Sequence, residues 1–315
     1  MTAMLRKLLL WGSENPFLTQ RLARLGFVRR AVRRFMPGET SEAAIEEAVK
    51  LSASRITSVL TLLGENVTEA AEAAEVARHY RAVLEEIASR DLETEISVKL
   101  TQLGIDIGHD VAAANLESIL ATAEERGQFV WIDVESSGYV DRTLELYRAA
   151  RARHVKTGIC LQAYLYRTAD DLAALLPLNP SIRLVKGAYA EAGEVAFPRM
   201  RDVDRNYFEL AKTLLGEVRP GGVQAGGVRA AFATHDERLI RDIEKEAAER
   251  GIARVDLEFQ MLYGIGAAQQ KALAAKGYRV EVLISYGTAW FPWYMRRLAE
   301  RPANLWFVMR KMVSR

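Results

Sequence analysis

The stretch EISVKL, at residues 95–100, decides the fold class of this chain together with the sequence that follows it. It is short, rich in apolar and β-branched residues, and typical of a strand. A helix-forming segment comes next, and a second run of the same kind, FVWIDV, begins at residue 129. A strand, a helix and another strand in this order predict two parallel strands joined by a crossover helix.

The same alternation continues in both directions along the chain. The strand-like runs are ITSVLTLL (56–63), EISVKL (95–100), FVWIDV (129–134), GICLQA (158–163), IRLVK (182–186), RAAFATH (229–235), DLEFQML (256–262) and VEVLIS (280–285). Eight such units favour a closed (β/α)8 barrel of the TIM type in the α/β class over an open doubly wound sheet, whose edge strands would be more polar. The absence of a GxGxxG motif after the first run disfavours the open sheet further.

Residues 1–53 contain no strand-like run and predict an N-terminal helical segment that packs on the catalytic barrel of residues 54–315. Asn15-Pro16 would open one helix there, and the stretch from Thr40 through Ser41 to Glu46 provides capping residues for another. The first residues are also expected to be helical, because no signal-peptide cleavage site follows their short apolar run.

The composition narrows the classes of function. Among 315 residues, 43 Lys and Arg stand against 41 Asp and Glu, and this balance disfavours a dedicated nucleic-acid binder. Cys160 is the only cysteine, which excludes an intrachain disulfide and favours a reducing cytoplasm. With four scattered histidines no metal site is expected. No apolar stretch approaches the roughly 20 residues that span a bilayer.

Polar residues occupy the inward positions near the ends of the predicted strands. Because side chains alternate along a strand, Lys99 is expected to point into the barrel, and the same parity pairs Trp131 with Asp133, Cys160 with Gln162, and Arg183 with Val185. Catalytic residues of such barrels lie at the carboxyl ends of the strands. Buried charges are costly without partners, so they indicate either a charged ligand at this mouth or an internal salt-bridge network.

A second group of charges lies in TAWFPWYMRRLAERPANLW, near the C-terminus. This stretch predicts a helix in which Glu300 can hold the guanidinium groups of Arg296 and Arg297. Two arginines together with Lys99 could bind one carboxylate, because guanidinium matches carboxylate in a planar, bidentate geometry. A solvated helix face is the alternative interpretation.

The strand-end motifs together resemble a known family. ISVKLTQLG, FVWIDVE, GICLQAYLYR, IRLVKGAY, FATHDERLI, EFQMLYGI and YGTAWFPWYMRRLAERPANL occur in this order between about residues 54 and 310. They resemble the successive motifs of the proline dehydrogenase family, of the monofunctional bacterial type. The resemblance implies a distorted barrel with its last helix over the mouth, and FAD bound noncovalently. It also implies oxidation of L-proline to Δ1-pyrroline-5-carboxylate by hydride transfer to flavin N5, the first step of proline catabolism to glutamate.

On the substrate side, the resemblance assigns the carboxylate of proline to Lys99, Arg296 and Arg297, with Glu300 holding the two arginines. The residues that would wall the proline ring are Leu184, Ala188 and Tyr189.

On the cofactor side, the resemblance places Arg183 near flavin N5 and lets Asp133 organise the polar network beside the substrate. The residues that would contact FAD are Val134, Gln162, Arg183, Lys186, Gly187, Ala188, Thr234 and His235. Val134 stands where the family usually has a methionine. A cation such as Arg183 or Lys186 near the flavin would favour the negative charge that develops there.

One position departs from the family pattern. Family members commonly have Tyr-x-Pro-Tyr-Gly before the last helix, whereas this chain reads Leu283-Ile284-Ser285-Tyr286-Gly287. Leu283 therefore replaces a tyrosine that contacts the substrate. This change predicts a reshaped ring pocket and leaves hydroxyproline, or a related cyclic amino acid, as an alternative substrate.

Two further alternatives belong to other classes of function. Lys99 and Lys186 at strand ends would suit a Schiff-base lyase, since a desolvated lysine can act as a nucleophile. A barrel that has lost catalysis and binds a protein partner is the other alternative, which the complete set of charged site residues disfavours.

The resemblance also implies partners. Family members pass electrons to membrane quinones, and a pyrroline-5-carboxylate dehydrogenase would use the product. Two basic amphipathic stretches, RLARLGFVRRAVRRF (21–35) and LWFVMRKMVSR (305–315), could rest on an anionic lipid surface, although ordinary helix packing explains them equally well. We therefore expect a cytoplasmic protein, with peripheral contact to the inner face of the cell membrane as a further expectation.

Overall fold

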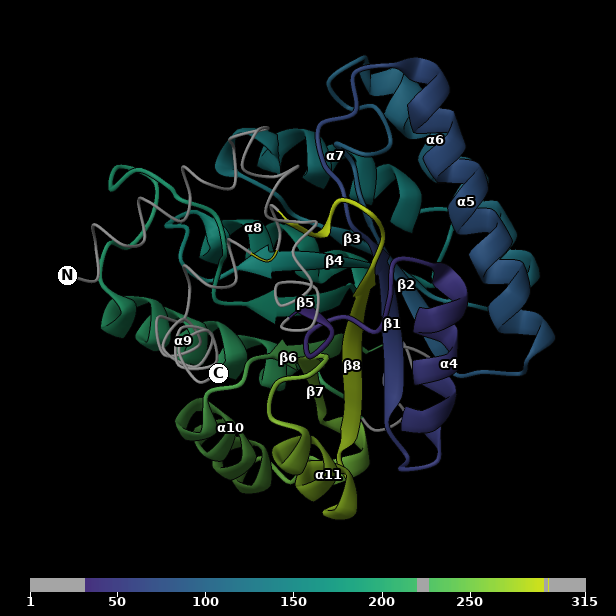
Figure 1. Cartoon of the computed structure of the whole chain (residues 1–315). Coiled ribbons are helices and arrows are strands. Elements are labelled where there is room, and N and C mark those ends of the chain that lie inside the picture. Colours follow the sequence, from purple (N-terminus) through teal and green to yellow (C-terminus); the bar gives the residue numbers. More distant parts are fainter. Residues whose placement is uncertain (1–31, 220–226, 292–293, 295–315) are drawn as a thin grey trace, which may run out of the picture.

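The fold is a closed barrel of parallel strands, seen in a computed structural model that describes residues 32–219, 227–291 and 294. The strands follow one another around the barrel in chain order, and β1 pairs with β8 to close it (Figure 1). They are β1 (Thr57–Leu62), β2 (Thr94–Lys99), β3 (Val130–Asp133), β4 (Thr157–Gln162), β5 (Ser181–Val185), β6 (Arg229–Ala233), β7 (Glu258–Leu262) and β8 (Arg279–Tyr286). All eight predicted runs form strands, which confirms the barrel and excludes the open sheet.

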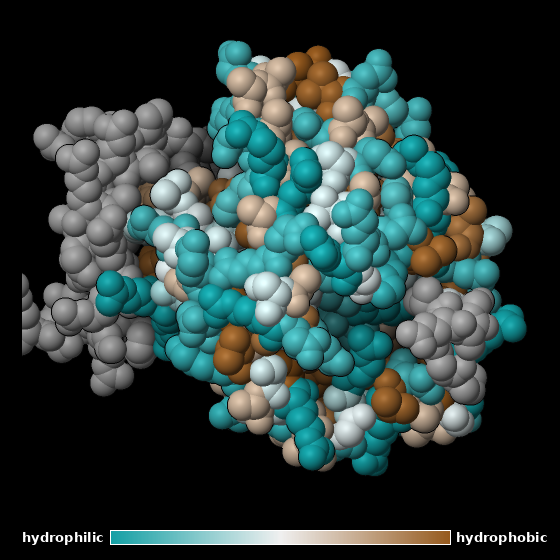
Figure 2. Space-filling view, turned by 90° about the vertical axis from the view of Figure 1, so that its right-hand side faces the viewer, coloured by the Kyte–Doolittle hydropathy of each residue, from teal (hydrophilic) through white to brown (hydrophobic). Residues whose placement is uncertain are grey.

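Helices surround the barrel on its outside (Figure 1). They are α4 (Ser41–Ser52), α5 (Ala70–Ser89), α6 (His109–Glu125), α7 (Val140–Arg151), α8 (Thr168–Leu175), α9 (Met200–Glu217), α10 (Glu237–Glu249) and α11 (Ala267–Ala275). Short 3-10 turns lie at η1 (Ser137–Tyr139), η2 (Leu176–Leu178) and η4 (Arg254–Asp256). Hydrophilic residues dominate the face shown in Figure 2, and hydrophobic residues form small separate groups on it. The helices therefore bury one face and leave a polar face to solvent.

The helix beside β1 and β8 is α4, which comes before β1 in the chain (Figure 1). Thr40 Oγ1 accepts a hydrogen bond from the backbone N–H of Ala43 at 3.4 Å, so Thr40 caps α4 as predicted. Ala44, Ile45 and Ala48 are buried on its inner face. The helix thus covers the seam at which the barrel closes. The helix predicted at Asn15-Pro16 lies outside the described residues.

Two kinds of side chain alternate along the strands. Residues such as Val98, Ile132 and Ile159 belong to the main hydrophobic core, which fills the space between the barrel and its helices. Their neighbours Lys99 and Asp133 line the barrel interior instead. This alternation gives the barrel an apolar outer layer and an interior in which charged groups lie beside a small apolar cluster of Val59, Trp131 and Ala231.

A buried ionic cluster fills the end of the barrel at which the strands begin. Arg229 binds Glu95 at 2.7 Å, Glu258 at 2.8 Å and Glu281 at 2.9 Å, and we call these four residues the floor cluster. Burial, with the carboxylates of Glu258 and Glu95 nearby, raises the pKa of Glu281 well above its usual range. The internal salt-bridge network considered as an alternative for the barrel charges therefore exists at this end.

The chain after β8 folds back against the segment that precedes α4. Trp290, Phe291 and Tyr294 are helical and buried. The indole N–H of Trp290 donates to Glu39 Oε1 at 3.0 Å, and the rings of Tyr294 and Phe35 lie 6.0 Å apart. The start of the predicted C-terminal helix is thereby attached to the N-terminal side of the barrel.

The buried hydroxyl of Tyr80 joins α5 to two strands, and its removal should destabilise the barrel. Tyr80 accepts a hydrogen bond from the N–H of Leu62 at 3.0 Å and donates one to the carbonyl of Ser97 at 2.9 Å. Tyr80→Phe should lower the free energy of unfolding by about 1–3 kcal/mol, because a buried N–H loses its acceptor. Denaturant titration measures this. Tyr166→Phe, at a half-exposed tyrosine, is the control, and equal losses would contradict the assignment.

Candidate active site

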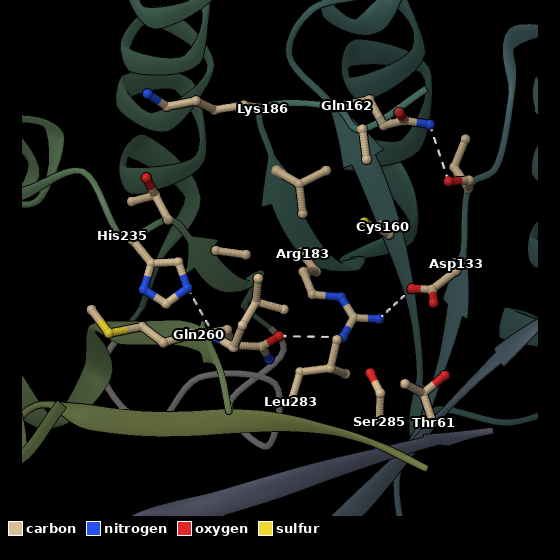
Figure 3. Close-up of a pocket in the computed structure, with 18 of the residues that line it drawn as sticks. Thr61, Asp133, Cys160, Gln162, Arg183, Lys186, His235, Gln260, Leu283 and Ser285 are labelled. Atoms are coloured by element: carbon tan, nitrogen blue, oxygen red, sulfur yellow. Dashed lines mark hydrogen bonds and ion pairs between the residues drawn. The ribbon is translucent and has the colours of Figure 1, made fainter. Parts of the chain in front are cut away.

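A cavity of about 600 Å³ opens where the strands end (Figure 3). Every one of the eight strands contributes to its wall, from Thr61 on β1 to Leu283 and Ser285 on β8. Its size is typical of small-molecule sites, and the carboxyl end is where barrels of this kind carry their chemistry. The cavity is therefore the candidate active site.

Most of the side chains predicted from sequence meet in this cavity. The predicted residues that line it are Lys99, Asp133, Val134, Gln162, Arg183, Lys186, Gly187, Ala188, Tyr189, Thr234, His235 and Leu283. Arg296, Arg297 and Glu300 lie outside the described residues, so their positions stay predictions.

The predicted role of Leu184 is wrong. Leu184 was predicted to wall the ring of the substrate, but its side chain is fully buried in the hydrophobic core between β5 and the outer helices. Strand parity explains the error: Arg183 and Val185 point into the barrel, so the residue between them points out. Leu184 contributes to packing and does not line the cavity.

Arg183 is the centre of the polar network in the cavity (Figure 3). Its Nη2 donates to Asp133 Oδ1 at 2.6 Å and to Ser97 Oγ at 2.5 Å, while Ser97 in turn donates to Asp133 Oδ1 at 3.0 Å. Its side chain is only 4 % exposed. Burial acts to lower the pKa of Arg183, but the combined effect of the neighbouring groups, with the carboxylate of Asp133 first among them, outweighs burial and raises this pKa. The guanidinium is therefore a fixed positive charge at the bottom of the cavity.

The two lysines of the cavity differ in their surroundings. Lys186 forms ion pairs with Asp204 at 2.6 Å and Asp236 at 2.8 Å. Asp236 also accepts hydrogen bonds from the first backbone N–H groups of α10, so this pair is anchored to a helix end. Within the described part of the chain, Lys99 has no carboxylate at ion-pair distance. Its charge does act on the carboxyl group of Glu135, where it lowers the pKa against the effect of burial.

Gln162 and Gly187 shape one wall for a ligand. Gln162 Nε2 donates to the backbone carbonyl of Val134 at 3.0 Å (Figure 3). It also donates to the backbone carbonyl of Glu135 at 2.6 Å, and the two bonds fix its amide. Among the described residues, its buried Oε1 has no hydrogen-bond partner. Gly187 has φ +120°, and a Cβ there would come within 2.3 Å of the Tyr164 ring. The unsatisfied acceptor of Gln162 suits a bound group that carries an N–H donor, and the close packing of Gly187 on Tyr164 leaves no space for a side chain at that position.

His235 and Cys160 complete the polar lining. The backbone N–H of Leu262 donates to His235 Nε2 at 3.0 Å, so a neutral imidazole carries its proton on Nδ1. Burial raises the pKa of the Cys160 thiol to about 12, so this thiol stays protonated and is a poor nucleophile. No carboxylate, histidine and cysteine cluster able to hold a metal occurs among the residues that the structure describes.

Sequence reasoning missed several residues of the cavity wall. Glu65 comes two residues after the end of the first strand run, so the rule that polar residues near strand ends carry the chemistry would have found it. Gln260 lies within the seventh strand run, DLEFQML, and sequence reasoning gives it no role. Phe35 reaches the cavity from the segment before α4, and no local pattern in the sequence indicates this.

The fold and the site together define an enzyme of the α/β-barrel class, with its chemistry at the carboxyl ends of the strands. The sequence profile described as Proline dehydrogenase matches residues 44–310, and this chain belongs to the proline dehydrogenase family. Membership makes it a flavin oxidoreductase.

Individual relatives agree with this assignment. The chain is 38% identical over 312 residues to Proline dehydrogenase 1 of Bacillus subtilis, covering 99% of this chain and 100% of the relative. It is 39% identical over 316 residues to Proline dehydrogenase of Deinococcus radiodurans, covering 98% of each. Proline utilization A from Bdellovibrio bacteriovorus, inactivated by N-propargylglycine, superimposes with a TM-score of 0.79 at 24% identity. That match covers 91% of this chain but only 34% of the larger protein, and it bears on the fold alone.

Gly187→Ala should remove bound flavin while the barrel stays folded. The new methyl group would overlap the Tyr164 ring and would hold alanine at a φ that only glycine adopts readily. Flavin absorbance per protein should fall severalfold. Gly193→Ala, in the same loop and with no atom within 4 Å of the new Cβ, is the matched control and should retain its flavin. Full retention by both variants would contradict the close approach at Gly187.

Glu135, behind the cavity, should make stability depend on pH. It accepts hydrogen bonds from the Thr101 hydroxyl at 2.6 Å and backbone N–H at 3.1 Å, and burial raises its pKa from 4.5 to about 7. The folded state then holds a proton that the unfolded state releases, so stability falls as pH rises from 4.5 to about 7. Relative to Glu135→Gln, the wild type should lose about 2–3 kcal/mol between pH 5 and pH 8. Unfolding titrations across this range measure the difference, and a constant difference would contradict the raised pKa.

Proposed function

We propose that this chain oxidises L-proline to Δ1-pyrroline-5-carboxylate with a noncovalently bound FAD as its oxidant. The observation that carries the proposal is the meeting of Lys99, Asp133 and Arg183 in one cavity at the carboxyl ends of the strands. Relatives that align over nearly their whole length, at 38–39% identity, are named as proline dehydrogenases. The cavity supplies fixed positive charge and a walled, partly apolar space, which an anionic cyclic substrate needs.

The residues of the cavity fit a flavin. Gln162 offers a fixed acceptor at which an N–H of the ring system could be bound, and Gly187 lines the same cavity while packing closely on the ring of Tyr164. Val134, Ala188, Thr234 and His235 line the same space and would complete the contacts. When bound, the flavin supplies the two-electron oxidant for the chemistry.

The substrate would be held by its carboxylate. Lys99 would bind it together with Arg296 and Arg297, while Glu300 would hold these arginines in place. Charge-assisted hydrogen bonds are the strong kind, and three of them would fix the position of the ring. Tyr189 and Leu283 would then form the wall against which the ring rests.

The reaction itself needs little from the protein beyond position and charge. Oxidation removes a hydrogen with two electrons from C5 of proline and a proton from its nitrogen, and a C5=N double bond forms. Arg183, fixed by Asp133, would stabilise the negative charge that develops on the oxidant side. Asp133 would organise the polar groups beside the substrate nitrogen. No covalent nucleophile is required, in agreement with the protonated thiol of Cys160.

Hydroxyproline is a second candidate substrate. Leu283 lines the cavity where the family commonly has a tyrosine, so the phenol that would contact the ring is replaced by an aliphatic side chain. The Schiff-base lyase is disfavoured at Lys186, because the two carboxylates beside this amine are unlike the apolar surroundings that make a lysine nucleophilic.

We further propose that electrons leave the enzyme to a membrane quinone and that a pyrroline-5-carboxylate dehydrogenase takes up the product. Residues 21–31 and 305–315 of the two basic stretches lie outside the described residues, so contact with the inner face of the cell membrane stays a prediction. In the part of the chain that the structure describes, no helix is long and apolar enough to cross a bilayer. We propose a cytoplasmic location with peripheral membrane contact, on the ground of the family resemblance.

Anaerobic spectra of the purified holoenzyme test the proposed function. Addition of L-proline should bleach the flavin absorbance, and hydroxyproline should do so at a rate that shows the effect of Leu283. Lys99→Met should raise the proline concentration for half-maximal bleaching by about 10- to 100-fold, because one charge-assisted contact to the carboxylate is lost.

The control for this variant is Lys156→Met, at a lysine that binds the carbonyl of Gly127 away from the cavity. It should leave the half-saturating concentration unchanged. A flavin that neither amino acid bleaches would overturn the proposed function, and an unchanged requirement for proline in Lys99→Met would remove Lys99 from the carboxylate site.

A further inference from the structure

Gln260 connects the floor cluster to the candidate active site. Its Nε2 donates to Glu258 Oε1 at 2.8 Å and to Glu281 Oε2 at 2.8 Å. On the other side, its Oε1 accepts a hydrogen bond from Arg183 Nη1 at 3.4 Å (Figure 3). The side chain is 4% exposed, so water cannot readily replace these bonds.

The two carboxylates fix which way the amide of Gln260 faces. An amide has a donating nitrogen and an accepting oxygen, and only the nitrogen can bind the carboxylate of Glu258, which its ion pair with Arg229 keeps ionised. The oxygen must therefore face Arg183, which has donors only. Arg229 holds both carboxylates in place through its own ion pairs, so the orientation is set by charges at the floor of the barrel.

The remaining sides of the Arg183 guanidinium are also held. Asp133 and Ser97 bind its Nη2, and the ring of Trp131 lies 5.0 Å from its central carbon. The Trp131 indole N–H donates to Glu95, a member of the floor cluster, at 2.6 Å. Gln260 accepts the hydrogen bond of Nη1, and the thiol of Cys160 also lies beside the guanidinium. Without Gln260, the guanidinium would be freer to tilt about its bonds to Asp133 and Ser97.

We propose that Gln260 is a positioning residue, which transmits the rigid geometry of the floor cluster to Arg183 and holds this guanidinium at the bottom of the cavity. The inference rests on the proposed function, in which Arg183 stabilises the charge that develops during oxidation. Gln260 acts through Arg183 and has no part in binding the carboxylate of the substrate.

The proposal predicts a change in rate without a change in affinity. In Gln260→Met, the limiting rate of anaerobic flavin reduction by L-proline should fall about fivefold to tenfold, as expected for one lost contact to a charged group. The half-saturating proline concentration should stay within about twofold, because Lys99 is untouched. Stopped-flow absorbance of the holoenzyme gives both quantities.

The matched control for a buried glutamine is Gln128→Met. Gln128 is 9% exposed and lies beside Lys156, away from the cavity, and neither of its side-chain polar atoms has a partner in the described structure. It should keep the wild-type rate. Ser97→Ala removes another hydrogen bond to Arg183 and changes only a small side chain. It should also lower the rate, and it serves as a second test if Gln260→Met folds poorly.

The decisive comparison uses Arg183→Lys as background. Lysine has no Nη1, so adding Gln260→Met to it should lower the rate no further, and the two substitutions should be strongly non-additive. Additive losses, an unchanged rate in Gln260→Met, or a rise in the half-saturating concentration as large as the fall in rate would each overturn the proposal. A wild-type protein that proline does not reduce would instead overturn the proposed function itself.

Discussion

The alternation of side chains along eight parallel strands is the constraint on which the rest of this structure depends. Every second residue must point into a closed barrel, and the others must point toward the helices. Val98, Ile132 and Leu184 follow this rule into the apolar layer, while Lys99, Asp133 and Arg183 follow it inward. One geometric rule therefore produces both the stability of the barrel and the charge of its interior.

Charges inside the barrel are arranged in levels from the floor to the mouth. The floor cluster surrounds Arg229 at the end where the strands begin, and Gln260 lies above it. Arg183 and Asp133 form the next level, and Lys99 lines the cavity at the end of β2. Hydrogen bonds join the floor cluster to Gln260 and Gln260 to Arg183. Arg183 is therefore already in place and need not move when charge develops during the reaction.

The sequence alone was sufficient for the architecture, because alternation of strands and helices is a local pattern. All eight strands lie where the apolar runs predicted them, and Thr40 caps α4 as expected. Leu184 shows how a family resemblance can mislead when it is not checked against strand parity, since Arg183 and Val185 were already assigned inward.

Long-range contacts were the part that local pattern could not supply. Phe35 reaches the cavity from the far end of the chain, and Gln260 owes its role to carboxylates on two strands, Glu258 on its own and Glu281 on the next. Neither contact is encoded in the spacing of neighbouring residues.

The position of α4 bears on how this catalytic unit can be divided. If the barrel is divided into strand-helix units, the first unit begins at β1. The helix that packs on β1 and β8 is α4, however, and α4 precedes β1 in the chain. A fragment beginning at Thr57 would lack the helix that packs on both of these strands. For gene fusion or truncation, the shortest fragment that keeps this helix therefore begins before Thr40. Evolution of the barrel by addition of strand-helix units would also have to preserve α4, which precedes the first strand.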